Sequence, residues 1–236
     1  MRPSYGIDAM PVVRNLSLIG FVLLILAAVA FVNDGSFRNF RWTFLSPAVF
    51  LLLAAALMVG YALVGKFRHR DRMLRLISWR GDERVLDVGT GRGLLMIGAA
   101  KKLDTGRAYG IDIFNAADLS GNKIENTRRN TEIEGVSSKT EVVNEDARKM
   151  SFPDAKFDVV LSNLCLHNIP NAEGRAEACR EIARVLKPGG RALISDFQNT
   201  AEYAQVFCDL GLEVSRSGPY FFDTFPPLRI VNVRKS

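Results

Sequence analysis

The amino-acid sequence predicts an α/β domain built on a doubly wound, mostly parallel sheet, with a transmembrane helical hairpin ahead of it. From about residue 84 onward, short apolar runs rich in β-branched residues alternate with helix-forming runs. A glycine-rich turn joins the first of these strands to the helix that follows it, and two long uncharged segments stand before residue 67. We therefore predict an N-terminal tail and two transmembrane helices in residues 1–66, at about 16–32 and 42–65, and the α/β domain in residues 67–236.

The glycine-rich turn has the sequence Asp87-Val-Gly-Thr-Gly-Arg-Gly93 and leads into a helix-forming run at 94–102. Glycine lets the backbone approach a ligand closely, because no Cβ blocks the way. The spacing is G-x-G-x-G, whereas a dinucleotide-binding turn has G-x-G-x-x-G. The carboxylate of Asp87 repels a pyrophosphate. The turn therefore favours a ligand with a positively charged end.

This turn resembles motif I of the class I S-adenosylmethionine-dependent methyltransferases, whose cofactor carries an ammonium and a sulfonium group. Further motifs follow in the order of that family. They are a strand ending at Asp112, a third strand ending near Asp146, a fourth at 157–163, and a helix, Pro-Gly-Gly turn and strand at 181–196. The resemblance covers about residues 68–200. It implies a Rossmann-like sheet of seven strands that binds S-adenosylmethionine.

The two later acids have expected roles at the cofactor. A carboxylate at the tip of the second strand of such a fold accepts hydrogen bonds from both ribose hydroxyls, which suits Asp112. The resemblance implies a contact between Asp146 and the adenine amino group. Taken singly, each acid also has a structural explanation, Asp112 as a helix N-cap and Asp146 as the cap of residues 147–150. The expected cofactor-binding residues are Asp87, Gly89, Gly91, Gly93, Asp112, Ile113, Asp146, Ala147 and Asn163.

The reaction that the resemblance implies is in-line transfer of the sulfonium methyl group to a nucleophile, for which alignment of donor and acceptor is the main requirement. His167, just past the fourth strand, is the candidate general base, and the alternative is a histidine that only shapes the pocket. Asn168 is a candidate for orienting the acceptor. No metal site is expected, because Cys165, Cys179 and Cys208 are scattered without metal-ligand spacing.

The two uncharged segments, 16–32 and 42–65, are long enough to form membrane spans. At 1.5 Å per residue the second crosses a hydrocarbon core of about 30 Å, and the first is at the lower limit. Trp42 and Tyr61 stand near the ends of the second segment, as interfacial aromatic residues often do. The short connection at 33–41 allows only a tight hairpin, so both ends of the hairpin are expected on one side.

The distribution of charge predicts which side that is. Six basic residues crowd the exit of the second segment, whereas the connection carries Arg38 and Arg41 against Asp34. The six are Lys66, Arg68, Arg70, Arg72, Arg75 and Arg80. The positive-inside rule then predicts a two-span membrane protein with its α/β domain in the cytoplasm. The alternative is a cleaved signal peptide, because the first segment contains the cleavage-site-like sequence Ala28-Val-Ala30.

A small-molecule or lipid acceptor is the expected partner. The basic segment from Lys66 to Arg80 can also hold the domain on anionic headgroups, at about 1 kcal/mol per residue near the surface. The aromatic cluster in 220–227 either closes the edge of the core or forms an apolar wall or a lip that dips into the membrane. Nucleic acid is not expected as a partner. Members of this class that methylate amino groups of nucleic acids usually carry an Asn/Asp-Pro-Pro-Tyr loop, and Asn163-Leu-Cys-Leu stands in that place.

Two other functions stay open. A non-catalytic cofactor-binding or scaffold protein would keep this fold, and a nicotinamide-dependent oxidoreductase would use Asp112 in the same way, although the glycine spacing disfavours it. Because every cofactor motif lies beyond Arg84, a chain beginning at Arg68 is expected to keep its affinity for S-adenosylmethionine.

Overall fold

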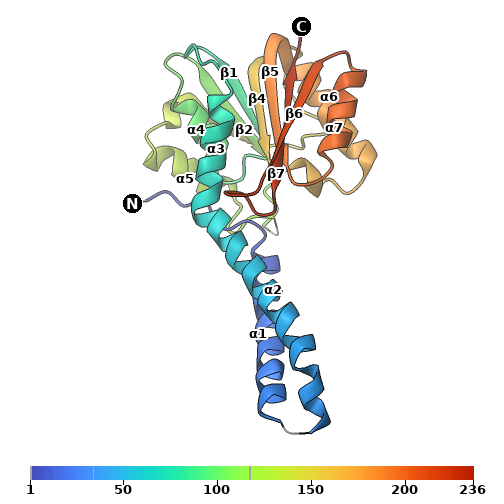
Figure 1. Ribbon diagram of the computed structural model, residues 1–236. Helices are drawn as coiled ribbons and strands as arrows, with labels where there is room; N and C mark the ends of the chain where they lie inside the picture. Colours follow the sequence, from blue (N-terminus) through green and yellow to red (C-terminus); the bar gives the residue numbers. More distant parts are fainter. Residues whose placement is uncertain (1, 34, 117) are drawn as a thin grey trace.

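The computed structural model describes residues 2–33, 35–116 and 118–236, so Asp34 of the hairpin connection lies outside the described residues. An α/β domain carries a helical hairpin that projects away from it (Figure 1). The sheet has seven strands in the order β3-β2-β1-β4-β5-β7-β6. The first five strands pair in parallel, and β7 pairs antiparallel with both β5 and β6. The predicted mostly parallel, doubly wound sheet is confirmed.

The strands are β1 (Arg84–Val88), β2 (Arg107–Asp112), β3 (Thr140–Asn144), β4 (Phe157–Asn163), β5 (Leu186–Asp196), β6 (Glu213–Tyr220) and β7 (Leu228–Arg234). The helices are α1 (Met10–Val32), α2 (Arg41–Gly60), α3 (Lys66–Arg75), α4 (Leu94–Ala100), α5 (Ile124–Ile133), α6 (Ala172–Val185) and α7 (Thr200–Asp209). Short 3-10 turns lie at Ser36–Phe40, Ser137–Lys139 and Leu166–Asn168, and one π-helical turn lies at Tyr61–Gly65.

Helices cover both faces of the sheet, which is why its central strands are almost wholly apolar. Successive side chains of a strand point to opposite faces. Leu86 of β1 accordingly packs in one core with residues of α6 and α7, while its neighbour Val85 packs in another with residues of α3 and α4. Each side of the sheet therefore holds its own apolar core, and the polar ends of the strands are left at the sheet edges.

The two N-terminal helices are long and apolar enough to cross a membrane, by length and composition. They are Met10–Val32, with mean hydropathy 2.6, and a continuous helical stretch at Ser36–Arg75, with mean hydropathy 2.4. The second runs from α2 through the π-helical turn into α3 without a break. The predicted domain boundary at residue 66 therefore falls inside a helix, which the apolar pattern could not show because only the composition changes there.

Helix α3 fixes where the hairpin stands relative to the sheet. Met73 and Leu74 of α3 are buried against the sheet, and the helix ends near the start of β1. Its other end lies at the carboxyl edge of the parallel strands, so the hairpin projects from that edge (Figure 1).

The tail before α1 returns to the α/β domain. The N–H of Ser4 donates to Asn130 Oδ1 (3.0 Å), and the Tyr5 hydroxyl donates to Glu134 Oε1 (2.7 Å). Further along the tail, the N–H of Ala9 donates to the carbonyl oxygen of Asp118 (3.0 Å). Both ends of the hairpin therefore meet the α/β domain. The tail packs on the domain rather than standing apart with the hairpin.

Candidate functional site

The glycine-rich turn follows β1 directly and is held against β2. The N–H groups of Gly89 and Thr90 both donate to the carbonyl oxygen of Ile111 (2.9 Å each). Gly89 and Gly91 adopt φ angles of 73° and 53°, which favour glycine. A Cβ on Gly89 would overlap the Sγ atom of Cys165, the side chain that packs on this turn from the end of β4. A residue with a side chain cannot replace Gly89, because Cys165 occupies the space that its Cβ would need.

This turn forms one side of a cavity of about 410 Å³ at the carboxyl edge of the sheet. Its volume is within the usual range for small-molecule sites. Eight of the nine predicted cofactor-binding residues line it: Asp87, Gly89, Gly91, Asp112, Ile113, Asp146, Ala147 and Asn163. The ninth, Gly93, is not among the lining residues. With a φ of 86° it precedes α4, so its role is to start that helix.

Asp87 is buried beside the cavity, and only one of its two carboxylate oxygens accepts hydrogen bonds. Its Oδ2 atom accepts from the Thr90 hydroxyl and from the N–H of Met96, both at 2.9 Å. Its Oδ1 atom is buried without a hydrogen-bond partner. Burial raises the pKa of this carboxyl from its ordinary 3.8 to about 7, against the two hydrogen bonds, which lower it. A cationic group at Oδ1 would favour the ionised form.

Asp112 ends β2 and organises the loops on either side. Its Oδ2 atom accepts from the N–H of Gly91 (2.8 Å), while its Oδ1 atom accepts from the N–H of Phe114 (2.6 Å) and from Asn122 Nδ2 (3.3 Å). The carboxylate thus ties the glycine-rich turn to the loop after β2. It lines the cavity between them, where a diol can reach it.

Asp146 lies on the loop that connects β3 to β4. Its carboxylate accepts from Arg148 in a two-pronged ion pair and from the N–H of the same residue (2.9 Å). Hydrogen bonds from Arg148 hold the pKa of Asp146 below its usual range. An adenine amino group would therefore meet a carboxylate that already has a cationic partner.

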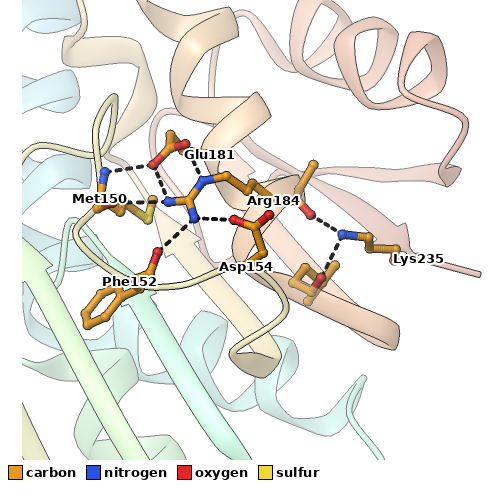
Figure 2. A network of polar contacts seen from close by, with 8 residues as sticks. Met150, Phe152, Asp154, Glu181, Arg184 and Lys235 are labelled. Atoms are coloured by element: carbon orange, nitrogen blue, oxygen red, sulfur yellow. Dashed lines mark hydrogen bonds and ion pairs between the residues drawn. The ribbon is translucent and has the colours of Figure 1, made fainter.

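Further along, Arg184 of α6 pins the same loop to the domain (Figure 2). Its guanidinium donates to the carbonyl oxygens of Met150 (3.1 Å) and Phe152 (2.8 Å), and it pairs with Asp154 and Glu181 at 2.7 Å each. The loop after β3 is thereby anchored on one flank while its first residues face the cavity.

Unpartnered polar atoms gather on the cavity. Among the described side chains, those of Asp8, Asp87, Arg92, Asn122 and Asn163 line the cavity and each has a buried nitrogen or oxygen without a hydrogen-bond partner. Buried polar groups are normally paired, so such a cluster indicates a ligand with several donors and acceptors. The cofactor expected from the sequence has an ammonium, a carboxylate, two ribose hydroxyls and an adenine. The residues present fit it.

Comparison with known proteins agrees with this geometry. Residues 86–194 match a family model described as a methyltransferase domain. The ubiquinone/menaquinone biosynthesis C-methyltransferase UbiE of Pseudomonas fluorescens is 35% identical over 125 residues, which cover 52% of this chain and 45% of that protein. The sterol 4-C-methyltransferase strm-1 of Caenorhabditis elegans is 35% identical over 120 residues, which cover 50% and 32%. The matched part spans less than half the length of these two relatives.

Solved structures show the same fold. A S-adenosylmethionine-dependent methyltransferase from Aquifex aeolicus superposes with a TM-score of 0.55 at 19% identity, covering 70% of this chain and 88% of its own. Residues 86–194 therefore match a methyltransferase domain and share the fold of S-adenosylmethionine-dependent methyltransferases. The cofactor of this domain is S-adenosylmethionine. The [4+2]-cyclase SpnF has this fold as well, with a TM-score of 0.58 at 18% identity over 72% of this chain and 81% of its own.

His167 lies next to the cavity but does not line it. Its Nδ1 atom lies 2.8 Å from Oδ1 of the fully buried Asp196, and its ring packs edge-on against Phe197, with centroids 4.7 Å apart. The neighbouring Asn168 lines the cavity, whereas His167 is not among the lining residues. The structure therefore places the predicted acceptor-orienting residue at the cavity and the predicted base one layer out.

Among the lining residues that the sequence did not mark, four lie well ahead of the matched residues 86–194. They are Tyr5 and Asp8 of the tail, Tyr61 of the π-helical turn, and Lys66 at the start of α3. Tyr61 is buried, and its hydroxyl accepts from Asn163 Nδ2 (3.3 Å). The cofactor motifs themselves lie beyond Arg84, and these four residues add to the wall from outside them. No family motif marks these positions, so no sequence signal identified them.

Cys165 lines the cavity next to the glycine-rich turn. Burial, followed by the nearby charges of Asp112, Asp196 and Asp87, raises the pKa of this thiol well above its ordinary value. The group is therefore held as a neutral thiol. Its Sγ atom packs against Gly89, so the side chain contributes shape to the cavity.

Proposed function

We propose that the protein is a membrane-anchored methyltransferase that transfers a methyl group from S-adenosylmethionine to a small or lipidic acceptor at the cytoplasmic face of a membrane. The observation that carries this proposal is the position of the cavity. It lies at the sheet edge from which the hairpin projects, and hairpin residues form part of its wall. An acceptor dissolved in the bilayer would then reach the cavity without crossing water.

The surface of the hairpin supports the membrane assignment. Leu18, Phe21 and Ile25 of α1, and Phe50 and Leu53 of α2, are each more than half exposed. Large contiguous apolar surfaces of this kind mark a membrane or a protein partner. The hydropathy of both helices and their lengths favour a membrane.

The loop between β6 and β7 adds a second apolar contact beside the hairpin. Phe221 and Phe222 are exposed, and the carbonyl oxygen of Asp223 lies so close to Gly65 that a Cβ there would overlap it. The aromatic cluster predicted at 220–227 therefore abuts the end of the second apolar helix. We propose that it dips into the headgroup region, which is the sharper of the two roles expected from the sequence.

The basic segment contributes less to membrane contact than its sequence indicates. Lys66 is buried in the cavity wall, and Arg72 pairs with Asp223 while its guanidinium stacks over Tyr220 (4.2 Å). Arg80 pairs with Asp82 some 15 residues along the chain from Gly65. Because α3 rises about 1.5 Å per residue, its far end lies more than a Debye length of about 8 Å beyond the hairpin. Arg68, exposed at the start of α3, is the member best placed for headgroups.

The chemistry requires little of the protein beyond binding and orientation. When bound, the cofactor supplies an electrophilic methyl group with a good leaving group. Asp87 and Asp112 would hold its ammonium and its ribose, while Asn168, which lines the same cavity, would orient the acceptor. His167 remains the proposed base, and Oδ1 of Asp196, 2.8 Å from its Nδ1 atom, would fix the orientation of its ring.

The acceptor is the decisive test. Total lipid from cells lacking this protein, and from the same cells complemented with it, should differ by one or more species shifted by the mass of one methylene, measured by untargeted mass spectrometry. The purified full-length protein in vesicles should then transfer label from S-adenosylmethionine into that species. Binding of the cofactor without turnover on any lipid or small-molecule extract would favour the non-catalytic alternative.

The cytoplasmic placement has its own test, which uses a native cysteine. Cys208 is exposed on the domain, whereas Cys179 is buried. A membrane-impermeant maleimide should label Cys208 only after the cells are permeabilised, with Cys208→Ser as the control for site. Labelling of intact cells would place the domain on the opposite face and remove the positive-inside argument.

A further inference from the structure

The charged residues that the tail and hairpin bring to the cavity have no assigned role. We propose that Lys66 and Asp8 form a subsite for the amino-acid end of the cofactor, in which Lys66 binds the carboxylate and Asp8 binds the ammonium. The inference rests on the proposed function and extends it, since it makes the membrane hairpin a part of the cofactor site.

Lys66 is a buried cation with one hydrogen-bond donor to spare. Its side chain is 4% exposed, and its Nζ atom donates to the carbonyl oxygens of Tyr5 (2.8 Å) and Gly6 (2.6 Å). An ammonium has three donors. Its nearest acid, Asp8 Oδ2, is 3.6 Å away, outside hydrogen-bonding distance. The third donor is thus available at a cavity wall, where a carboxylate would satisfy it.

Asp8 is the complementary half of the pair. Its Oδ2 atom is buried without a hydrogen-bond partner, and the residue lines the same cavity. An ion pair at 3.6 Å with one oxygen unpartnered is a loose pair, and it compensates poorly for the burial of its Lys66 member. A ligand that carries both an ammonium and a carboxylate on one carbon would satisfy both members at once. The unpartnered Oδ1 of Asp87 lies in the same cavity and can share the ammonium.

The other cations at the cavity are less suited to the carboxylate. Arg148 is held by Asp146. Arg92 donates from NH1 to the carbonyl oxygen of Ser120 at 3.4 Å, a long contact, and its Nε atom is buried without a partner, so it is the competitor for this role. Lys66 differs from both because its side chain is only 4% exposed and its ammonium is held by two backbone carbonyl oxygens.

The subsite explains why the tail folds back. The two carbonyl oxygens that hold Lys66 belong to the tail, and the tail is tied to α5 by Ser4 and Tyr5. Removing either the tail or the hairpin would therefore dismantle the same charged pair. A chain beginning at Arg68 is now expected to bind the cofactor weakly, in contrast to the expectation from the motifs.

The experiment compares three ligands on the full-length protein in detergent micelles, by isothermal titration. S-adenosylhomocysteine carries both charged groups, its decarboxylated analogue keeps only the ammonium, and 5′-methylthioadenosine has neither. Lys66→Met should weaken S-adenosylhomocysteine about tenfold to a hundredfold, as expected for losing a charged hydrogen bond, and should leave the other two within about twofold. Asp8→Asn should weaken the first two ligands and leave the third unchanged.

The matched control is Arg68→Met, which removes an exposed cation two positions further along the same helix. It should change none of the three affinities. Unchanged affinity of Lys66→Met for S-adenosylhomocysteine would overturn the subsite. An equal loss of affinity for 5′-methylthioadenosine would overturn it as well, because that result indicates a collapsed cavity. If the wild-type protein binds none of the three ligands, the proposed function fails and the subsite fails with it.

Discussion

Replacing Asp112 with alanine tests the cofactor site at the residue on which both neighbouring loops depend. In the free protein its carboxylate accepts from the N–H groups of Gly91 (2.8 Å) and Phe114 (2.6 Å) and from Asn122 (3.3 Å). Asp112→Ala leaves these donors without their acceptor. A part-buried donor left unpaired costs about 1–3 kcal/mol. At roughly 2–4 °C per kcal/mol for a chain of this size, the melting temperature should fall by about 2–12 °C.

The same change removes the acceptor for the ribose hydroxyls. Hydrogen bonds to a charged group contribute about 1.5–3 kcal/mol, so the dissociation constant for S-adenosylhomocysteine should rise roughly tenfold to 150-fold. Isothermal titration of the full-length protein measures this directly, at a temperature below the lowered melting point. NAD, titrated in parallel, should bind more weakly than S-adenosylhomocysteine to the wild-type protein.

Asp82→Ala is the matched control. Asp82 stands just before β1, at the opposite edge of the sheet, and its ion pair with Arg80 is exposed on both sides. Its loss should change stability by less than about 1 kcal/mol and cofactor affinity not at all. If Asp112→Ala lowers the melting temperature but keeps full affinity, Asp112 only shapes the loops. Tight NAD binding without a response to S-adenosylhomocysteine would refute the methyltransferase assignment itself.

Three further outcomes are expected. The pKa of Asp87 is raised from 3.8 to about 7, so in the free protein the stability linked to its protonated form is present below about pH 4 and lost as the pH rises toward 7. A cationic ligand favours the ionised form, so affinity for S-adenosylhomocysteine should rise between pH 6 and 8 by titration, and this dependence should flatten in Asp87→Asn. Gly65→Ala should displace the loop at Asp223, because the added Cβ would overlap a backbone carbonyl, and the loop should then be cleaved faster in limited proteolysis. Phe221→Ser with Phe222→Ser should leave affinity for 5′-methylthioadenosine unchanged but reduce turnover on a lipid acceptor in vesicles; equal turnover would remove the proposed lip.

The sequence contains enough local information to predict the fold and the cofactor. Strands and helices follow from periodicity over a few residues, and the acids at the ends of β1 and β2 stand at the edge where a parallel sheet binds its ligands. These features are local, and the order of the motifs places them relative to one another. For this reason Asp87, Asp112 and Asn163 could be predicted to line one cavity, and the structure brings them together.

Charge and aromatic content could be counted from the sequence, but their placement could not. The six basic residues after the second span form one segment in the sequence. In the structure α3 carries five of them, from Lys66 at the cavity wall to Arg75, and Arg80 lies beyond the end of that helix. His167 follows β4 as a base would, yet the buried carboxylate of Asp196 draws its ring behind the cavity wall. In both cases the outcome depends on contacts between elements that are far apart in the chain.

The contribution of the hairpin to the cavity is the part that only the tertiary structure decided. Lys66 meets Tyr5 across 61 positions of sequence, and Tyr61 meets Asn163 across 102. A hydrophobic pattern records which helix face is apolar, and it says nothing about which polar side chain at the end of that helix will be enclosed by a returning tail. The sequence by itself determined that there is a methyltransferase fold with an apolar hairpin. The packing of the tail over Lys66 joined the two into one site.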